Sequence, residues 1–126
     1  MKPVQLRAIV CALAVAATVA VCSPAEAQST TTAVLLDQCR PKTVGARADA
    51  DRRLCLTFVQ AIADLLYHRG EICIPGGTTA GQVRDTVLRW IAKQHSPRGM
   101  VAAAATFRAL TEAFPCSGAQ RAPLLY

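Results

Sequence analysis

The chain has 126 residues and a formal net charge of +6, from 14 lysine and arginine residues against 8 aspartate and glutamate residues. This length is enough for one small domain. The basic residues are scattered and no aromatic residues are interleaved with them, so the pattern does not favour nucleic-acid binding.

Residues 1–27 have the three parts of a cleavable export signal. Lys2 and Arg7 give a positively charged start, and an apolar run follows from Ala8 to Val21. Ala25-Glu26-Ala27 then supplies the small residues of a cleavage site. The apolar run is too short to span a bilayer comfortably. We therefore interpret residues 1–27 as a signal peptide.

We expect the mature chain to begin at Gln28, as a periplasmic protein with no membrane insertion. Lipidation at Cys22 is the alternative. It is disfavoured because Val21 stands where a lipoprotein signal has Gly, Ala or Ser. No later apolar run is long enough to cross a membrane.

Cysteine usage after the signal points to covalent bridges. Neither His68 nor His95 lies near a cysteine in sequence, and no two cysteines have the Cys-x-x-Cys spacing, so a zinc site is disfavoured and we expect no metal. An even number of cysteines in a small exported chain indicates two disulfides. The cysteines are Cys39, Cys55, Cys73 and Cys116.

Four segments have helical periodicity and none alternates like a strand, so the predicted fold is all-α, a small four-helix domain with one short and three longer helices. The first helix covers residues 33–39 and ends at Arg40-Pro41, because proline disfavours helical geometry in the residue before it. The second runs from about Asp49 to Tyr67. Its predicted inner face is Cys55, Phe58, Val59, Ile62, Leu65 and Leu66.

The third helix begins at a capping box, Thr79-x-x-Gln82, and extends to about Gln94. Asp85 and Arg89 are one turn apart, in the order that favours an ion pair. The predicted inner face is Val83, Val87, Trp90 and Ile91.

The fourth helix is predicted to start at Ser96-Pro97, a cap followed by a first-turn proline, and to stop at Pro115. Residues 117–126 are interpreted as a tail after a domain covering residues 28–116. The predicted inner face of the helix is Met100, Ala103, Ala104, Phe107, Leu110 and Phe114.

Topology selects one disulfide pairing. Helices joined by a short connection pack antiparallel, which brings Cys73, before the third helix, to Cys116, after the fourth. Cys39 likewise ends the first helix close to where Cys55 begins the second. A Cys55–Cys73 bridge would have to span most of the second helix, about 18–20 Å. A disulfide holds its Cα atoms within about 7 Å. We predict Cys39–Cys55 and Cys73–Cys116.

Catalytic groups are poorly represented. His68 and His95 lie at predicted helix ends, and the cysteines are better used as bridges than as nucleophiles. Asp64 lies on or beside an apolar helix face, where it bonds a neighbouring backbone group or marks a binding surface. Residues 74–77 lack the Lys-Ser/Thr of a phosphate loop. The sequence favours a binding module without a cofactor and argues against an enzyme.

Three motifs resemble the Rap/Tai group of periplasmic immunity proteins, which protect against type VI secretion amidase effectors. They are Cys73-Ile74-Pro75, Thr79-Ala80-Gly81-Gln82 and Phe114-Pro115-Cys116. The resemblance covers about residues 33–116. Upstream, the group has a cysteine followed by Gly-Tyr, a second glycine and an aspartate. The family-motif residues that match or replace this pattern here are Phe58, Asp64, Pro75, Gly81, Gln82, Phe114 and Pro115.

The upstream motif departs from the group at three positions. Thr57 and Ala61 replace the glycines, and Phe58 replaces the tyrosine, which removes a hydroxyl group able to form a hydrogen bond. These changes leave the expected fold in place and weaken the inference about the partner.

The resemblance implies a disulfide-bonded helical protein, often a homodimer, that occludes the cleft of an incoming peptidoglycan amidase. The segment expected to face the amidase is residues 94–99, with His95, Ser96 and Arg98 as contact residues. An acid-activated periplasmic chaperone is the alternative, although the chain has few carboxylates to trigger opening. An accessory envelope protein with the same fold is a third interpretation.

Overall fold

The computed structural model describes residues 29–117. The expected signal peptide and residues 118–126 of the expected tail lie outside the described residues. Four helices follow one another in the described part: α2 (Thr32–Cys39), α3 (Ala46–His68), α4 (Ala80–Ala92) and α5 (Ala102–Ala113). The only pairing of extended backbone within residues 29–117 is an isolated bridge between Thr31 and Val101. The all-α prediction is confirmed.

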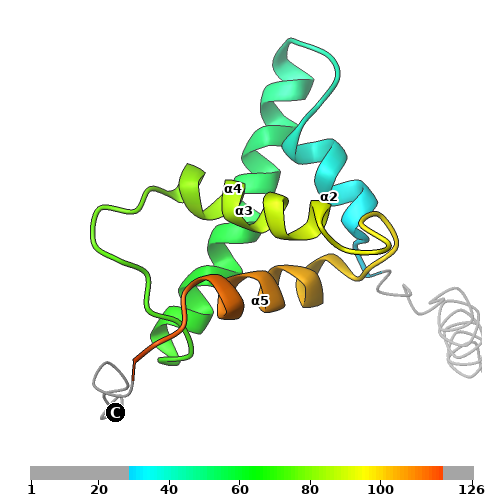
Figure 1. The fold of residues 1–126 in the computed structure, drawn as a ribbon. Helices are drawn as coiled ribbons and strands as arrows, with labels where there is room; N and C mark the ends of the chain where they lie inside the picture. The colour runs from blue at the N-terminus through cyan, green and yellow to red at the C-terminus, as the bar shows by residue number, and fades with distance from the viewer. Residues whose placement is uncertain (1–28, 118–126) are drawn as a thin grey trace, which may run out of the picture.

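The other three helices pack against the long helix α3 (Figure 1). The helix α2 packs beside the N-terminal half of α3, and α4 and α5 lie side by side, run in opposite directions and cross α3. Within residues 29–117, no helix combines the length and the apolarity that a membrane span requires.

Both disulfides have the predicted pairing. The Cys39–Cys55 bridge joins the end of α2 to α3, with the two Cα atoms 5.0 Å apart. The Cys73–Cys116 bridge holds the segment before α4 to the segment after α5, with the Cα atoms 4.9 Å apart. A backbone hydrogen bond of 2.9 Å from Cys73 N to the carbonyl of Phe114 reinforces the second bridge.

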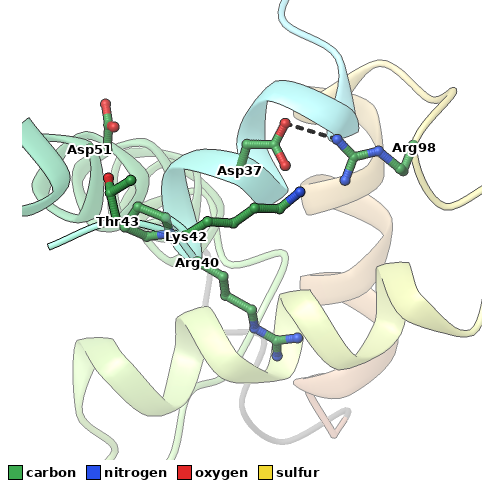
Figure 2. Close-up of a pocket in the computed structure, with 7 residues that line it drawn as sticks. Asp37, Arg40, Lys42, Thr43, Asp51 and Arg98 are labelled. Atoms are coloured by element: carbon green, nitrogen blue, oxygen red, sulfur yellow. Dashed lines mark hydrogen bonds and ion pairs between the residues drawn. The ribbon is translucent and has the colours of Figure 1, made fainter.

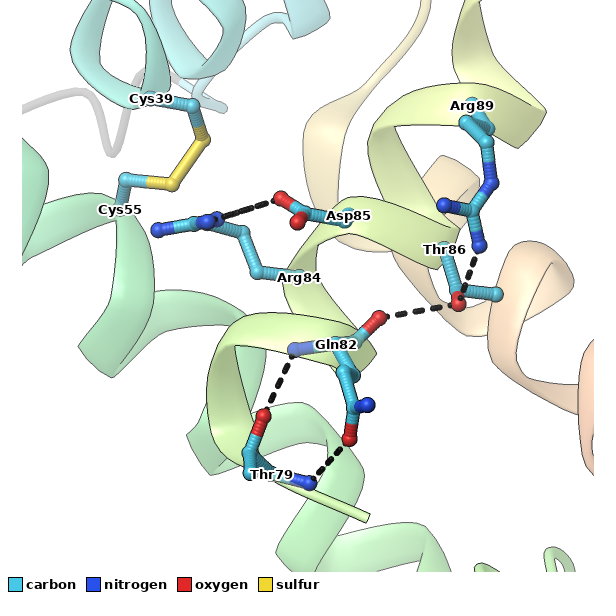
Figure 3. A network of polar contacts seen from close by, with 8 residues as sticks. All are labelled: Cys39, Cys55, Thr79, Gln82, Arg84, Asp85, Thr86 and Arg89. Atoms are coloured by element: carbon cyan, nitrogen blue, oxygen red, sulfur yellow. Dashed lines mark hydrogen bonds and ion pairs between the residues drawn. A yellow bond between two sulfur atoms is a disulfide. The ribbon is translucent and has the colours of Figure 1, made fainter.

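The start of α4 is the predicted capping box (Figure 3). The Thr79 amide donates to Gln82 Oε1 at 2.8 Å, and the Gln82 amide donates to Thr79 Oγ1 at 3.2 Å. The predicted ion pair between Asp85 and Arg89 is wrong. Asp85 forms its ion pair with Arg84 instead, with Arg84 Nη2 2.8 Å from Asp85 Oδ1. Arg89 donates a hydrogen bond of 3.0 Å to Thr86 Oγ1. Arg84 can pair with Asp85 because its side chain reaches the adjacent carboxylate directly.

The boundaries of three helices differ from the prediction by more than one residue. The helix α3 begins at Ala46, three residues before Asp49, because Gly45 adopts a φ of +113° and turns the chain there. The helix α4 ends at Ala92, two residues before Gln94. The largest difference is at α5, which begins at Ala102 instead of Ser96-Pro97.

The late start of α5 has its cause in the first residues of α2. The Thr32 amide donates to the carbonyl of Met100 at 2.8 Å, the Ala33 amide to that of Arg98 at 3.1 Å, and the Ala102 amide to that of Thr30 at 2.8 Å. We call these contacts between residues 30–33 and 98–102 the N-terminal clasp. They satisfy amide groups at the start of α2 that have no partner within that helix. Because the Arg98 and Met100 carbonyls accept amides of α2, they are not aligned along the axis of α5, and that helix begins only after them.

The core lies where α2, α4 and α5 meet α3. Its largest fully buried side chains are Leu35, Leu66, Ile72, Leu88, Ile91 and Leu110. The predicted inner face is wrong at Leu65, which is 56% exposed. Successive residues of a helix point about 100° apart, and here the neighbouring Leu66, at 1% exposed, is the one that faces the core.

The inner face of α5 was also predicted wrongly, at Ala103, Ala104 and Phe107. Phe107 is 43% exposed, and both alanines are exposed. The helix instead buries Ala102, Ala105, Thr106, Ala109 and Leu110. A face of small residues lets the α5 backbone approach its neighbours closely, which a phenyl ring on that face would prevent.

Candidate functional site

Two connections meet along one side of α2. The α2–α3 connection and the α4–α5 connection border an open hollow of about 320 Å³ (Figure 2). We call it the loop hollow. It is lined by Asp37, Arg40, Pro41, Lys42, Thr43, Asp51 and Arg98.

An ion pair links the α4–α5 connection to α2 across the hollow. Arg98 Nη2 lies 2.8 Å from Asp37 Oδ2, and both side chains remain more than half exposed. The Arg98 carbonyl also accepts the Ala33 amide of the N-terminal clasp. The α4–α5 connection is therefore fixed to α2 through both its backbone and its side chain.

Positive charge in the hollow is not fully neutralised. Among the described residues, neither Arg40 nor Lys42 has a carboxylate within 4.0 Å. Figure 2 shows the Lys42 side chain extending toward the Asp37–Arg98 pair, while Arg40 points toward α4. Asp51 lies beside Thr43, away from the Lys42 ammonium group. The hollow thus offers two cations that have no anionic partner in the described part of the chain.

The predicted contact residues lie in the turn that leads into the hollow. His95 and Ser96 are exposed, and the Ser96 carbonyl accepts the Gly99 amide at 3.2 Å. Of the three predicted residues, only Arg98 lines the hollow. Sequence reasoning missed both Arg40, which was interpreted only as part of the stop signal of the first helix, and Lys42. The adjacent Cys39 could have indicated them, because its predicted disulfide fixes the position of the residues that follow it.

Most family-motif residues occupy helix ends and core contacts. Gly81 and Gln82 lie in the first turn of α4, and Phe114 caps α5 through its amide and packs against the core. Phe58 also packs against the core. Pro75 and Pro115 are exposed beside the Cys73–Cys116 bridge. These positions support the fold.

Asp64 is an exposed motif residue in the C-terminal half of α3. Its Oδ1 accepts a hydrogen bond of 2.7 Å from Gln60 Nε2, and not from a backbone group as one of the two interpretations had it. It borders a shallow hollow on α3 together with Thr57 and Ala61, the residues that replace the group's glycines.

A third polar surface surrounds Trp90, which was predicted to lie in the core. Its ring is half-buried, and its Nε1 donates to Glu112 Oε2 at 2.5 Å. The Arg108 guanidinium lies 6.0 Å from the ring centroid. The indole N–H is therefore already bonded to Glu112, and Arg108 already lies over the face of the ring.

Within residues 29–117 there is neither a free cysteine nor a cluster of metal-binding side chains. The four cysteines within residues 29–117 are all in disulfides, so none of them is a free nucleophile. No group of three or more His, Cys, Asp or Glu side chains in this range is arranged to hold a metal ion. The chemistry that this arrangement supports is recognition by ion pairs and hydrogen bonds.

One comparison with known proteins identified a family. The model of the Rap1a immunity proteins matches residues 31–116, a range that includes all four helices, both disulfides and the loop hollow. Comparisons with curated proteins and with solved structures gave no match.

Proposed function

Because this chain belongs to the Rap1a immunity protein family, we propose that it is a periplasmic immunity protein that binds a toxic effector and blocks its active cleft. The family match over residues 31–116 carries the proposal. The effector that we propose is a peptidoglycan amidase delivered by type VI secretion. Inhibition is by occlusion, and the immunity protein itself makes and breaks no bond.

The segment that enters the cleft is the α4–α5 connection, residues 94–99. His95 and Ser96 are exposed there, and the N-terminal clasp and the Asp37–Arg98 pair hold the backbone of the segment in place. A segment that is already ordered loses less conformational entropy on binding than a free loop. These contacts support the choice of the segment.

The test measures inhibition of the product of the neighbouring open reading frame, which the proposal expects to be a secreted peptidoglycan amidase. Mature protein at equimolar concentration should abolish release of soluble fragments from purified peptidoglycan. The double substitution His95→Glu and Arg98→Glu should abolish inhibition. The control Arg69→Glu introduces a charge reversal in an exposed ion pair with Glu71, at the end of α3, and should inhibit like the wild type.

The outcomes separate two claims. Absence of binding by the wild-type protein would overturn the immunity function. Full inhibition by the double-substituted protein would leave that function in place and show that another surface contacts the amidase.

The proposed compartment depends on the signal peptide over residues 1–27 and a mature domain over residues 28–116. Mass spectrometry of the periplasmic fraction should find an N-terminus at Gln28. A full-length or lipidated product would contradict the proposed export route.

We extend the proposal to a homodimer through an exposed stripe of α3. Leu54 and Leu65 are each 56% exposed, and the exposed Ala61 lies between them on the same side of the helix. Apolar surface of this kind is typical of an interface between proteins. Light scattering should give a dimeric mass that Leu54→Glu with Leu65→Glu reduces to a monomer. A monomeric wild-type protein would contradict this extension.

A further inference from the structure

We infer that the loop hollow recognises an acidic segment of the protein partner, whose carboxylate groups pair with Lys42, Arg40 and Arg98. The inference rests on the proposed function, which places the α4–α5 connection against a protein partner. It adds the chemistry of the partner segment, which the family match does not supply.

The cations of the hollow come from two distant parts of the chain. Arg40 and Lys42 belong to the α2–α3 connection, and Arg98 belongs to the α4–α5 connection. Lys42 brings three N–H donors, and no bond of its side chain to another described residue is present. Arg98 donates to Asp37 only through Nη2, so other donors of its guanidinium group remain open to an incoming acceptor.

The two carboxylates in the hollow do not cancel this charge. Asp37 is neutralised by Arg98 at 2.8 Å, and Asp51 lies away from the Lys42 ammonium group (Figure 2). An arriving carboxylate therefore meets more positive than negative charge at the wall between Lys42 and Arg98. Without Lys2, Arg7 and Glu26 of the proposed signal peptide the net charge is +5, which also favours approach of an acidic partner.

The walls of the hollow are held before any partner arrives. Arg40 follows Cys39, which is bonded to Cys55 in α3, and Pro41 fixes the backbone between the two cations. On the other wall, the N-terminal clasp holds the Arg98 backbone. The open space of about 320 Å³ between these walls can admit side chains of a partner segment.

The experiment uses a blocked tetraglutamate peptide as the probe and ¹⁵N-labelled mature protein at low ionic strength. Saturable amide shifts should appear at Thr43 and Gly99, and they should weaken as salt is added. Lys42→Gln combined with Arg40→Gln should weaken the peptide affinity by about fivefold, because two exposed ion pairs are lost and each contributes a factor of about two, at most about five.

The matched control is Arg69→Gln, which removes a cation at the far end of α3 and should keep the wild-type affinity. Blocked tetralysine should give no shifts at Thr43 and Gly99. Equal shifts with inorganic phosphate would overturn the inference, because they would indicate a general anion site. No response to tetraglutamate, or an unchanged affinity in the double variant, would also overturn it.

This test and the amidase test fail separately, because the peptide titration does not use the amidase. Amidase inhibition without a peptide response would overturn only the acidic-segment inference. A peptide response that Lys42→Gln with Arg40→Gln removes would support this inference even if the partner proved not to be an amidase.

Discussion

The two disulfide-bonded regions of the molecule are built differently. At the Cys73–Cys116 bridge, the backbone is also joined by a hydrogen bond, and the neighbouring motif residues cap helices or contact the core. Near Cys39–Cys55, the hollow has cations without partners among the described residues, and its second wall is held by backbone contacts to residues 30–33. The first region supports the fold, and the second leaves charged groups available for binding.

Removing the bridges should give the largest effect. Cys73→Ala with Cys116→Ala opens a loop of 43 residues and should lower the free energy of unfolding by about 4 kcal/mol. Cys39→Ala with Cys55→Ala opens a loop of 16 residues and should cost about 3 kcal/mol. Urea unfolding followed by circular dichroism measures both. The comparison between the two regions would fail if losing Cys39–Cys55 left the peptide affinity of the hollow unchanged in a protein that still folds.

The N-terminal clasp can be weakened by one isosteric substitution. Thr32 is fully buried, and its Oγ1 accepts the Met100 amide at 3.1 Å. Thr32→Val should cost about 1–3 kcal/mol, because it leaves buried polar groups without that partner. It should also increase hydrogen exchange in residues 98–101.

A matched control for Thr32→Val exists in α5. Thr106 is equally buried, but its Oγ1 has no hydrogen-bond partner among the described residues. Thr106→Val should therefore be neutral or stabilise the protein by about 1 kcal/mol, since it removes a buried hydroxyl that forms no bond. Equal destabilisation by the two substitutions would show that the hydroxyl of Thr32 does not hold the clasp.

A substitution in the capping box at the start of α4 should have a smaller effect on stability. Thr79→Ala removes the oxygen that accepts the Gln82 amide and should lower stability by about 1 kcal/mol. Thermal unfolding measures the loss. Because the cap lies outside the hollow, tetraglutamate affinity should stay at the wild-type value, and a parallel loss of both would contradict the separation of the two regions.

The ion pair across the hollow should matter least for stability. Asp37 and Arg98 are both more than half exposed, so Asp37→Asn should change the free energy of unfolding by less than about 1 kcal/mol. The same substitution removes the anion that competes for Arg98. Tetraglutamate should then bind more tightly, and a weaker affinity would show that Asp37 mainly positions Arg98.

Local patterns predicted the parts of the fold that local forces determine. The periodic apolar residues predicted the four helices, and Thr79 with Gln82 predicted the cap of α4. The expected antiparallel packing of the helices predicted both disulfide pairings. The start of α5 was wrong, because Ser96-Pro97 has a good local helix signal but residues 98–102 bond the chain near Thr31. No local pattern shows a contact between such distant residues.

The hollow escaped prediction for the same reason. Arg98 was predicted as a contact residue from its position in the α4–α5 connection alone. Asp37, Arg40 and Lys42 lie close to it only because α2 packs beside that connection. The predicted face of α5 was rotated around the helix: it contained Ala103, Ala104 and Phe107, whereas the packed face contains Ala105, Thr106 and Ala109.

The N-terminal clasp also decides how the protein can be handled. The Thr30 carbonyl lies against the Ala102 amide, so a purification tag placed just before Thr30 would begin next to the connection proposed to enter the amidase. Ser117 instead follows the Cys73–Cys116 bridge, at the opposite end of the α4–α5 pair. Immobilisation through a tag placed directly after Ser117 would therefore leave the proposed contact surface accessible in a binding assay.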